Sequence, residues 1–230
     1  MTARIQGAPA SRGNRAWRNS DDGYDFFNIF KSAFNAPLLL ENNWAYENGF
    51  DDEMRPTAGD GNGFQLGGRR DDGNGNSGGH TLNNNLSWRN RVDGFYENNA
   101  SDALTLINNS AYNNGQWNYA FWTTPHVFYN NLSSGSMGVS ICCGASRSVA
   151  DHNSWTLPVA VSAADFLSLD SSLATGPRAG NGELPDTNFL RLAPTSDLID
   201  KGVNVGLAYA GQKPDLGAYE ASGVRPAGSA

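Results

Sequence analysis

Paired asparagines recur along the first two thirds of the chain at a nearly constant spacing. Each pair follows a short apolar stretch and precedes small or aromatic residues, as in TLINNSAYNNG at 105–115. The second asparagines are Asn43, Asn85, Asn109 and Asn131, and Asn153 continues the series in the shorter copy VADHNSW at 149–155. The last three steps of this series are 24, 22 and 22 residues. A short period of this kind indicates a solenoid in which each repeat forms one turn. Equivalent side chains then stack along the axis, where asparagine amides can bond to the copies before and after them.

The repeat favours a right-handed parallel β-helix over other repeat folds. Leucine-rich repeats have similar periods, but their LxxLxLxxN signature is missing, and the blades of a β-propeller are longer. We therefore predict an all-β chain with about six coils over residues 1–160, with inserted loops near 50–60 and 69–79. Residues 161–220 contain four prolines and no repeat, so we expect an irregular C-terminal cap that winds back on the last coil. Residues 221–230 are expected to be a flexible tail.

Charge and cysteine content exclude several classes of protein. The formal net charge of −7 argues against a nucleic-acid partner, because such binders usually carry a basic patch. The two cysteines are the adjacent Cys142 and Cys143, without a CxxC motif, so we predict neither a zinc site nor a disulfide framework. No apolar run is long enough to span a membrane. The first residues contain no apolar segment of signal-peptide length, so we expect a secreted monomer whose export signal is missing from this chain.

The stretch NSDDGYDFFN at 19–28 places Asp21, Asp22 and Asp25 within five positions. Crowded carboxylates repel one another unless a cation lies between them, and Ca²⁺ takes six to eight oxygen ligands. The alternative is a solvated Asp-Gly turn without a metal. Because a third aspartate follows the pair so closely, we favour a calcium site at these three residues.

A second strand follows each asparagine-rich turn, and its copies align without gaps. They read DDGYDF at 21–26, GNGFQL at 61–66, VDGFYE at 92–97 and WNYAF at 117–121. Stacking these copies predicts a buried aromatic ladder of Tyr24, Phe64, Phe95 and Tyr119. The next column contains Asp25, Gln65, Tyr96 and Ala120, which alternation along the strand directs outward. Gln65 is therefore predicted to lie one coil from Asp25.

The sequence resembles the family nine pectate lyases. The similarity rests on NSDDGYDFFN, GNGFQLGG, HTLNNNLSWRN and DGFYENNASDALTLINNSAYNNG, and on the later pieces FLSLD, LPDTNFLRLAP, LIDKG and PDLGAYE. The resemblance implies a right-handed parallel β-helix and calcium-dependent cleavage of polygalacturonate by β-elimination. It also implies that Asp21, Asp22 and Asp25 are calcium ligands and that the substrate is an acidic polysaccharide. Relative to the family, the chain looks truncated at its N-terminus, and a further aspartate ligand from an earlier coil is absent.

The position of the family's catalytic base is occupied by a different residue here. The family motif reads GNGFKLGG, with a lysine that removes the proton, whereas this chain has Gln65. An amide is not a useful proton acceptor, although it can hydrogen-bond to a sugar. Lys31, Arg69 and Arg70 are the candidates for a substitute base or for substrate binding, and ordinary surface charge is the alternative for all three.

Three functions stay open on the sequence. The first is a calcium-dependent lyase of pectate-like polymers, impaired to the extent that Gln65 cannot act as a base. The second is a non-catalytic β-helix module that binds acidic polysaccharide. The third is a glycosidase, which would require two carboxyl groups about 5 to 10 Å apart.

Overall fold

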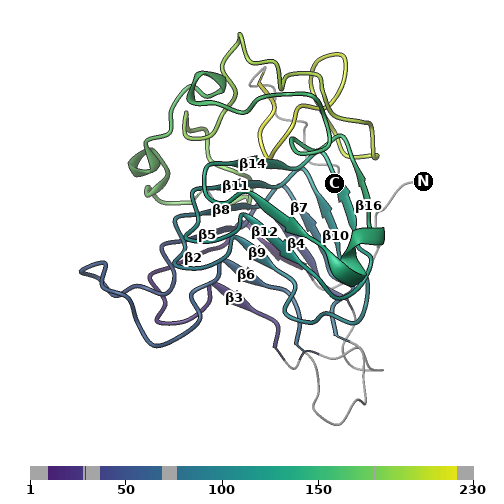
Figure 1. Cartoon of the computed structure of the whole chain (residues 1–230). Coiled ribbons are helices and arrows are strands. Elements are labelled where there is room, and N and C mark those ends of the chain that lie inside the picture. Colours follow the sequence, from purple (N-terminus) through teal and green to yellow (C-terminus); the bar gives the residue numbers. More distant parts are fainter. Residues whose placement is uncertain (1–9, 28, 30–36, 69–76, 179, 222–230) are drawn as a thin grey trace.

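The chain winds into a solenoid of short parallel strands (Figure 1). The computed structural model describes residues 10–27, 29, 37–68, 77–178 and 180–221. Three parallel sheets run along the axis, and we refer to them as sheets A, B and C. The predicted right-handed parallel β-helix is therefore confirmed. Helical structure in the described residues consists of the short 3₁₀ segments η1 (Cys143–Arg147), η2 (Ala163–Asp165) and η3 (Ser171–Ala174), and none of it is long and apolar enough to cross a bilayer.

Each sheet receives one strand from each successive coil, so strand order follows the coils. Sheet A contains β1 (Ala10–Arg12), β4 (Leu39–Glu41), β7 (Thr81–Asn83), β10 (Thr105–Ile107), β13 (Val127–Tyr129) and β16 (Val149–Asp151). Sheet B contains β2 (Arg15–Trp17), β5 (Trp44–Tyr46), β8 (Leu86–Trp88), β11 (Ser110–Tyr112) and β14 (Leu132–Ser134). Sheet C contains β3 (Tyr24–Asp25), β6 (Phe64–Gln65), β9 (Phe95–Tyr96), β12 (Tyr119–Phe121) and β15 (Val139–Ile141).

The asparagine pairs form the turn between sheets A and B. The first asparagine of four pairs has a left-handed backbone, with φ of 56° at Asn42, 55° at Asn84, 52° at Asn108 and 58° at Asn130. Asparagine tolerates this conformation better than most residues do. The second asparagine is buried, and its amide donates to the side-chain oxygen of its equivalent in the next coil at 2.9–3.1 Å, from Asn43 through to Asn153. The predicted ladder is therefore present.

A second ladder at the turn between sheets B and C was not predicted. The amide of Asn48 donates to Asn90 at 2.8 Å, and that of Asn90 donates to Asn114 at 2.9 Å. The amide of Asn114 donates to the side-chain oxygen of Asn118 at 2.9 Å. The series begins with the amide of Asn19, which donates to the side-chain oxygen of Asn48 at 3.1 Å. In the coils that contain β5, β8 and β11, buried amides thus hold both turns in register.

Removing one amide from the first ladder should cost about 2–4 kcal/mol of unfolding free energy. The side chain of Asn109 donates to Leu82 O and Asn131 Oδ1, and it accepts from the backbone and side-chain nitrogens of Asn85. Asn109→Ala leaves buried donors of Asn85 unpaired, at about 1–3 kcal/mol for each such group. Urea denaturation measures the loss. The exposed Asn188→Ala serves as the control and should change stability by less than about 0.5 kcal/mol; equal losses in both variants would contradict a stabilising ladder.

The interior of the solenoid is filled by aliphatic and aromatic side chains from all three sheets. The predicted aromatic ladder is part of it: Tyr24 stacks on Phe64 at 4.7 Å, Phe64 on Phe95 at 4.9 Å, and Phe95 on Tyr119 at 5.1 Å between ring centroids. Strand pairing aligns the same residues from coil to coil. The rings of this ladder lie on the inward face of sheet C. The alternate residues of the sheet C strands therefore face away from the core.

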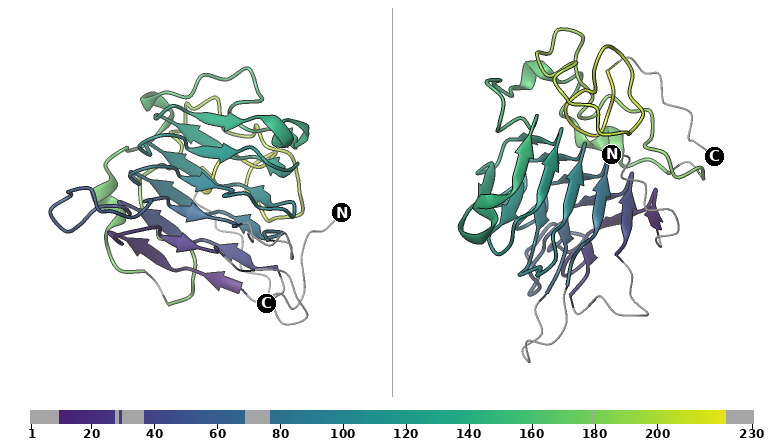
Figure 2. Two further views of the ribbon diagram at one scale, coloured as in Figure 1. Left: turned by 60° about the horizontal axis from the view of Figure 1, so that its bottom comes forward. Right: turned by 90° about the vertical axis from the view of Figure 1, so that its right-hand side faces the viewer.

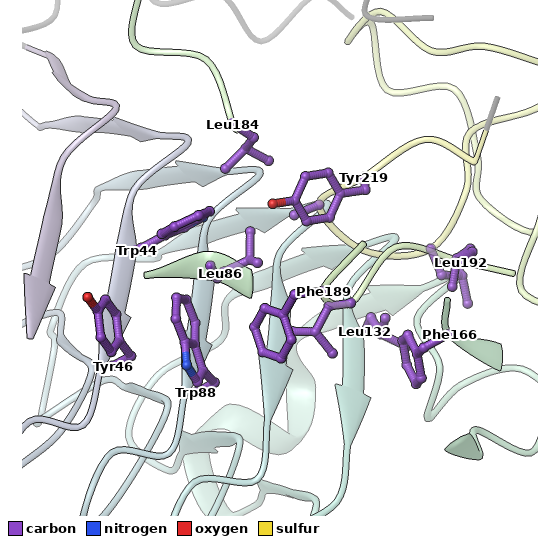
Figure 3. Close-up of a cluster of buried hydrophobic side chains, with 14 of the residues drawn as sticks. Trp44, Tyr46, Leu86, Trp88, Leu132, Phe166, Leu184, Phe189, Leu192 and Tyr219 are labelled. Carbon is purple, nitrogen blue, oxygen red and sulfur yellow. The ribbon is translucent and has the colours of Figure 1, made fainter. Parts of the chain in front are cut away.

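The C-terminal segment, residues 157–221, covers the outer face of sheet B. That face carries Trp44, Tyr46, Leu86, Trp88 and Leu132, and the segment packs Phe166, Leu184, Phe189, Leu192 and Tyr219 against them (Figure 3). The segment also reaches the first coils, since the Arg178 guanidinium lies 4.7 Å from the Trp44 ring and Arg15 donates to Thr175 O at 2.9 Å. We expected a cap that winds back on the last coil. The segment instead runs along the side of the solenoid, because burying the apolar outer face of sheet B removes it from water.

The loop at 50–60 leaves the solenoid between β5 and β6 and projects from the stack of coils (Figure 2). An isolated antiparallel bridge between Phe50 and Pro56 closes its outer part. Most of the second predicted insertion, residues 69–76, and most of the predicted tail, residues 222–230, lie outside the described residues.

Candidate functional site

Asp21 and Asp22 lie on the turn that leads into β3, where the loop at 50–60 returns to the solenoid. The backbone N–H of Asp60 donates to Asp21 Oδ1 at 2.6 Å, and that of Asn62 donates to Asp22 Oδ1 at 2.5 Å. Gly59 lies so close to this turn that a Cβ there would be 2.5 Å from Asp21 Oδ1. The loop is therefore docked directly on the two aspartates.

This docking adds a third carboxylate to the pair. Asp21, Asp22 and Asp60 each offer an oxygen, and these three oxygens lie within 4.8 Å of one another. Asp22 is only 8% exposed, whereas Asp21 and Asp60 are exposed. The pKa of Asp22 is raised to about 7, chiefly by burial and also by the neighbouring charges of Asp21, Asp25 and Asp60, against the lowering effect of the Asn62 hydrogen bond. Such a site favours either a bound proton or a cation.

Sequence reasoning missed Asp60, which was assigned only to an inserted loop. Its position depends on Arg91, whose guanidinium donates to the carbonyl oxygens of Gly59 and Asp60, the latter at 3.1 Å. The side chain of Arg91 passes close to Gly49 and Gly61 at the base of the loop. The signal that could have found Asp60 is weak: an aspartate next to a glycine, immediately before the strand that bears Gln65.

Asp25 and Gln65 are neighbours on sheet C, as the aligned repeats predicted. They are paired in register between β3 and β6, and Gln65 Nε2 donates to Asp25 Oδ1 at 2.8 Å. The same carboxylate oxygen accepts from the backbone N–H of Phe27 at 2.7 Å. Asp25 is exposed, but it is outside the group of three carboxylates that Asp21, Asp22 and Asp60 form. The structure thus joins two of the three predicted ligands to Asp60 and pairs the third with Gln65.

Gln65 is more enclosed than an outward-facing surface residue would be. Its side chain is 5% exposed, and among the described residues its Oε1 has no hydrogen-bond partner. The amide is oriented with its nitrogen toward Asp25, as required of a donor to a carboxylate. A buried carbonyl oxygen without a partner is an available acceptor for a hydroxyl or for a metal-bound water.

The remaining predicted residues cannot be placed. Lys31, Arg69 and Arg70 lie outside the described residues, so their roles stay predictions.

Asp93, which shares the column of Asp22 and Asn62, accepts from the Trp117 N–H at 2.9 Å, and burial raises its pKa to about 6. The column Asp22, Asn62 and Asp93 therefore has a structural use, since each side chain accepts a backbone N–H from the next coil.

The stacked sheets, the amide ladders and the acidic turn beside sheet C define a right-handed parallel β-helix protein with a candidate cation site. A family model described as "Pel9A-like, right handed beta helix region" matches residues 4–133. The chain belongs to this Pel9A-like family.

Individual relatives agree with this family. Pectate lyase L of Dickeya dadantii (strain 3937) is 40% identical over 215 residues, which are 90% of this chain and 47% of that protein. Pectate lyase L of Paenibacillus polymyxa (strain SC2) is 34% identical over 197 residues, 82% of this chain and 42% of that protein. The chain thus spans about half the length of the curated relatives it matches.

Two solved structures share the fold. The crystal structure of pectate lyase Pel9A superimposes with a TM-score of 0.76 at 40% identity, over 90% of this chain and 49% of the other. A structure named rhamnogalacturonan lyase gives a TM-score of 0.68 at 30% identity, over 80% of this chain and 47% of the other.

Proposed function

We propose that this chain is part of a calcium-dependent polysaccharide lyase that cleaves pectate-like polyuronates by β-elimination. The observation that carries the proposal is the group formed by Asp21, Asp22 and Asp60 within 4.8 Å, at the turns that lead into β3 and into β6, the strand that carries Gln65 at the position of the family's base. The names of its relatives support the substrate class, because several are pectate lyases. A polymer outside the cell as substrate would require the whole protein to be secreted.

The residues present fit calcium. Carboxylate oxygens are the ligands that this hard cation prefers. The raised pKa of Asp22 reflects first its burial and then the neighbouring charges of Asp21, Asp25 and Asp60, and a bound cation would offset both. Asp21, Asp22 and Asp60 would hold the ion, and Asp25 would join them through the oxygen that Gln65 and Phe27 leave free. Calcium, when bound, would neutralise the uronate carboxylate and make the adjacent C5 proton more acidic.

The protein's own residues then position the ligands and the substrate. The backbone N–H groups of Asp60 and Asn62 orient Asp21 and Asp22, and Arg91 holds the loop in place. Gln65 can accept a hydrogen bond from the sugar through its Oε1, which has no partner in the part of the chain that the structure describes. It cannot remove the C5 proton, since an amide has no useful basicity.

Gln65 favours a second function, a non-catalytic module that binds acidic polysaccharide through calcium. The two functions share the cation site and differ only in proton removal. Lys31, Arg69 and Arg70 remain the candidates for a substitute base or for contacts to substrate carboxylates.

Ultraviolet absorbance of unsaturated product separates these functions. Polygalacturonate is incubated with the protein in calcium and, in parallel, with a chelator, while calorimetry measures calcium and polygalacturonate binding. A signal that appears only with calcium supports the lyase. Binding of both ligands without product supports the module. Absence of calcium binding would remove both proposals, because neither works without the cation.

Calcium affinity should rise with pH until Asp22 is ionised. The pKa of Asp22 is raised from 3.8 to about 7, so the ion has to displace a proton in mildly acidic solution. We expect the affinity to increase roughly tenfold per pH unit between about 5 and 7 and then to level off. Without calcium, folding stability depends on pH in the opposite direction. The stability that Asp22 contributes in its protonated form is complete below pH 3.8 and is lost as the pH rises through about 7.

Calorimetry in buffers of different ionisation heat measures both the affinity and the released proton. Asp93→Asn is the matched control, since Asp93 also has a raised pKa but serves the Trp117 N–H in a later coil. This variant should keep the dependence on pH, whereas Asp22→Asn should lose calcium binding. An affinity that does not change between pH 5 and pH 7 would contradict proton displacement from Asp22, and calcium binding that survives in Asp22→Asn would exclude Asp22 as a ligand.

A further inference from the structure

Cys142 and Cys143 lie where the last strand of sheet C ends and η1 begins. Both thiols are free and exposed, and their sulfur atoms are 2.8 Å apart. A disulfide bond measures about 2.05 Å, so only a small movement separates the two sulfurs from bonding. Neighbouring cysteines in an ordinary strand would point to opposite faces and hold their sulfurs far apart.

The backbone brings these side chains together. Cys142 is extended, with φ of −142° and ψ of −174°, and its N–H donates to Phe121 O at 3.1 Å in the preceding coil. Cys143 has a left-handed φ of 56°, which is uncommon for a residue other than glycine and costs conformational energy. This reversal directs the Cys143 side chain toward the sulfur of Cys142.

The following turn is fixed against the neighbouring coil. Gly144 lies so close to Thr123 that a Cβ there would be 1.8 Å from the Thr123 carbonyl oxygen, so only glycine fits. Ser146 Oγ donates to the carbonyl oxygen of Cys143 at 2.7 Å. The close approach of the sulfurs therefore belongs to an anchored turn. The pKa of the Cys142 thiol is raised, chiefly by its hydrogen bond with Cys143.

We propose that Cys142 and Cys143 form a reversible modification site, at which a small-molecule disulfide oxidant converts the two thiols into a bridge between neighbouring residues. One cysteine thiolate attacks the oxidant disulfide, forms a mixed disulfide and releases one oxidant thiol. The second cysteine then attacks the protein sulfur of that mixed disulfide and releases the other thiol. Two thiols of the protein are oxidised, one disulfide of the oxidant is reduced, and two protons move from the protein to the released thiols.

We expect the bridge to be reduced readily because Cys142 and Cys143 are consecutive residues. Consecutive Cα atoms are about 3.8 Å apart across a trans peptide, less than the roughly 4.4–6.8 Å usual for disulfides. A bridge across that separation closes a small ring and is exposed, and both properties make a disulfide easier to reduce. The site would therefore change state with the redox conditions around the protein.

Oxidised glutathione tests the site on the folded chain. After incubation, intact mass and iodoacetamide labelling should show that both thiols disappear together, with loss of two hydrogen atoms and no glutathione added. Peptide mapping should find the bridge within one peptide, and dithiothreitol should restore both thiols. Cys142→Ser and Cys143→Ser should each take up one glutathione instead, because the remaining sulfur has no neighbour to displace it.

Other outcomes contradict the site. Wild-type protein that keeps glutathione on one or both cysteines, forms covalent dimers, or retains two free thiols overturns the proposal. A bridge that dithiothreitol does not open overturns its reversibility. If a serine variant does not fold, the mass and peptide map of the wild-type chain still decide.

Discussion

Replacing Gln65 with lysine should raise the release of unsaturated product from polygalacturonate by about 10²–10⁴-fold, the usual contribution of a positioned general base. The side chain at this position already reaches the site, since Gln65 Nε2 lies 2.8 Å from Asp25 Oδ1. An amine there can accept a proton once it is neutral. Burial and a nearby bound cation both lower the pKa of a lysine, which increases its neutral fraction.

Two variants control this experiment. Gln65→Met keeps the length of the side chain without a base and should show no gain over the wild-type rate. Adding Asp22→Asn to the Gln65→Lys variant should remove the gained activity, because the cation site would be lost. A Gln65→Lys variant that binds calcium and polygalacturonate yet releases no more product than wild type would contradict the proposal that proton removal is the missing step.

Trp88→Ala should lower the unfolding free energy by about 3–5 kcal/mol. Trp88 is 0% exposed and lies where sheet B meets the C-terminal segment, stacked on Tyr46 at 4.5 Å and in edge contact with Phe189 at 5.1 Å (Figure 3). Truncation leaves a large cavity between two parts of the chain that each contribute to this cluster. We also expect proteases to cut residues 157–221 sooner in the variant than in the wild type.

Trp17→Ala is the matched control for this prediction. Trp17 occupies the same column of sheet B two coils earlier, paired through Tyr46, but it is 43% exposed. Its loss should cost about 1 kcal/mol or less, with no change in proteolysis of the C-terminal segment. Urea denaturation of both variants compares them directly, and equal losses would show that the cover on sheet B contributes little to stability.

The periodic features of the solenoid could be predicted from the amino-acid sequence. The columns that contain Tyr24 and Phe64, and those that contain Asp25 and Gln65, follow from aligning the repeats, and strand pairing confirms both. The second amide ladder was equally periodic, with Asn48, Asn90 and Asn114 at matching places, and a closer alignment would have found it. Repeats make such contacts predictable because each coil has only its neighbours to pair with.

Contacts made by segments outside the repeat could not be predicted in the same way. Asp60 meets Asp21 across 39 residues, and its place depends on the shape of the loop and on Arg91. The C-terminal segment has no period, and its course along sheet B depends on an apolar face that the strands build together.

The sequence by itself determined the winding of this protein and the register of its coils, because buried amides and stacked rings favour one alignment of successive repeats. Only the tertiary structure decided that Asp60 completes the acidic group, that Asp25 is bonded to Gln65, and that the C-terminal segment lies along the solenoid. These depend on loop closure and on surfaces assembled from several coils, and no local pattern of residues encodes either.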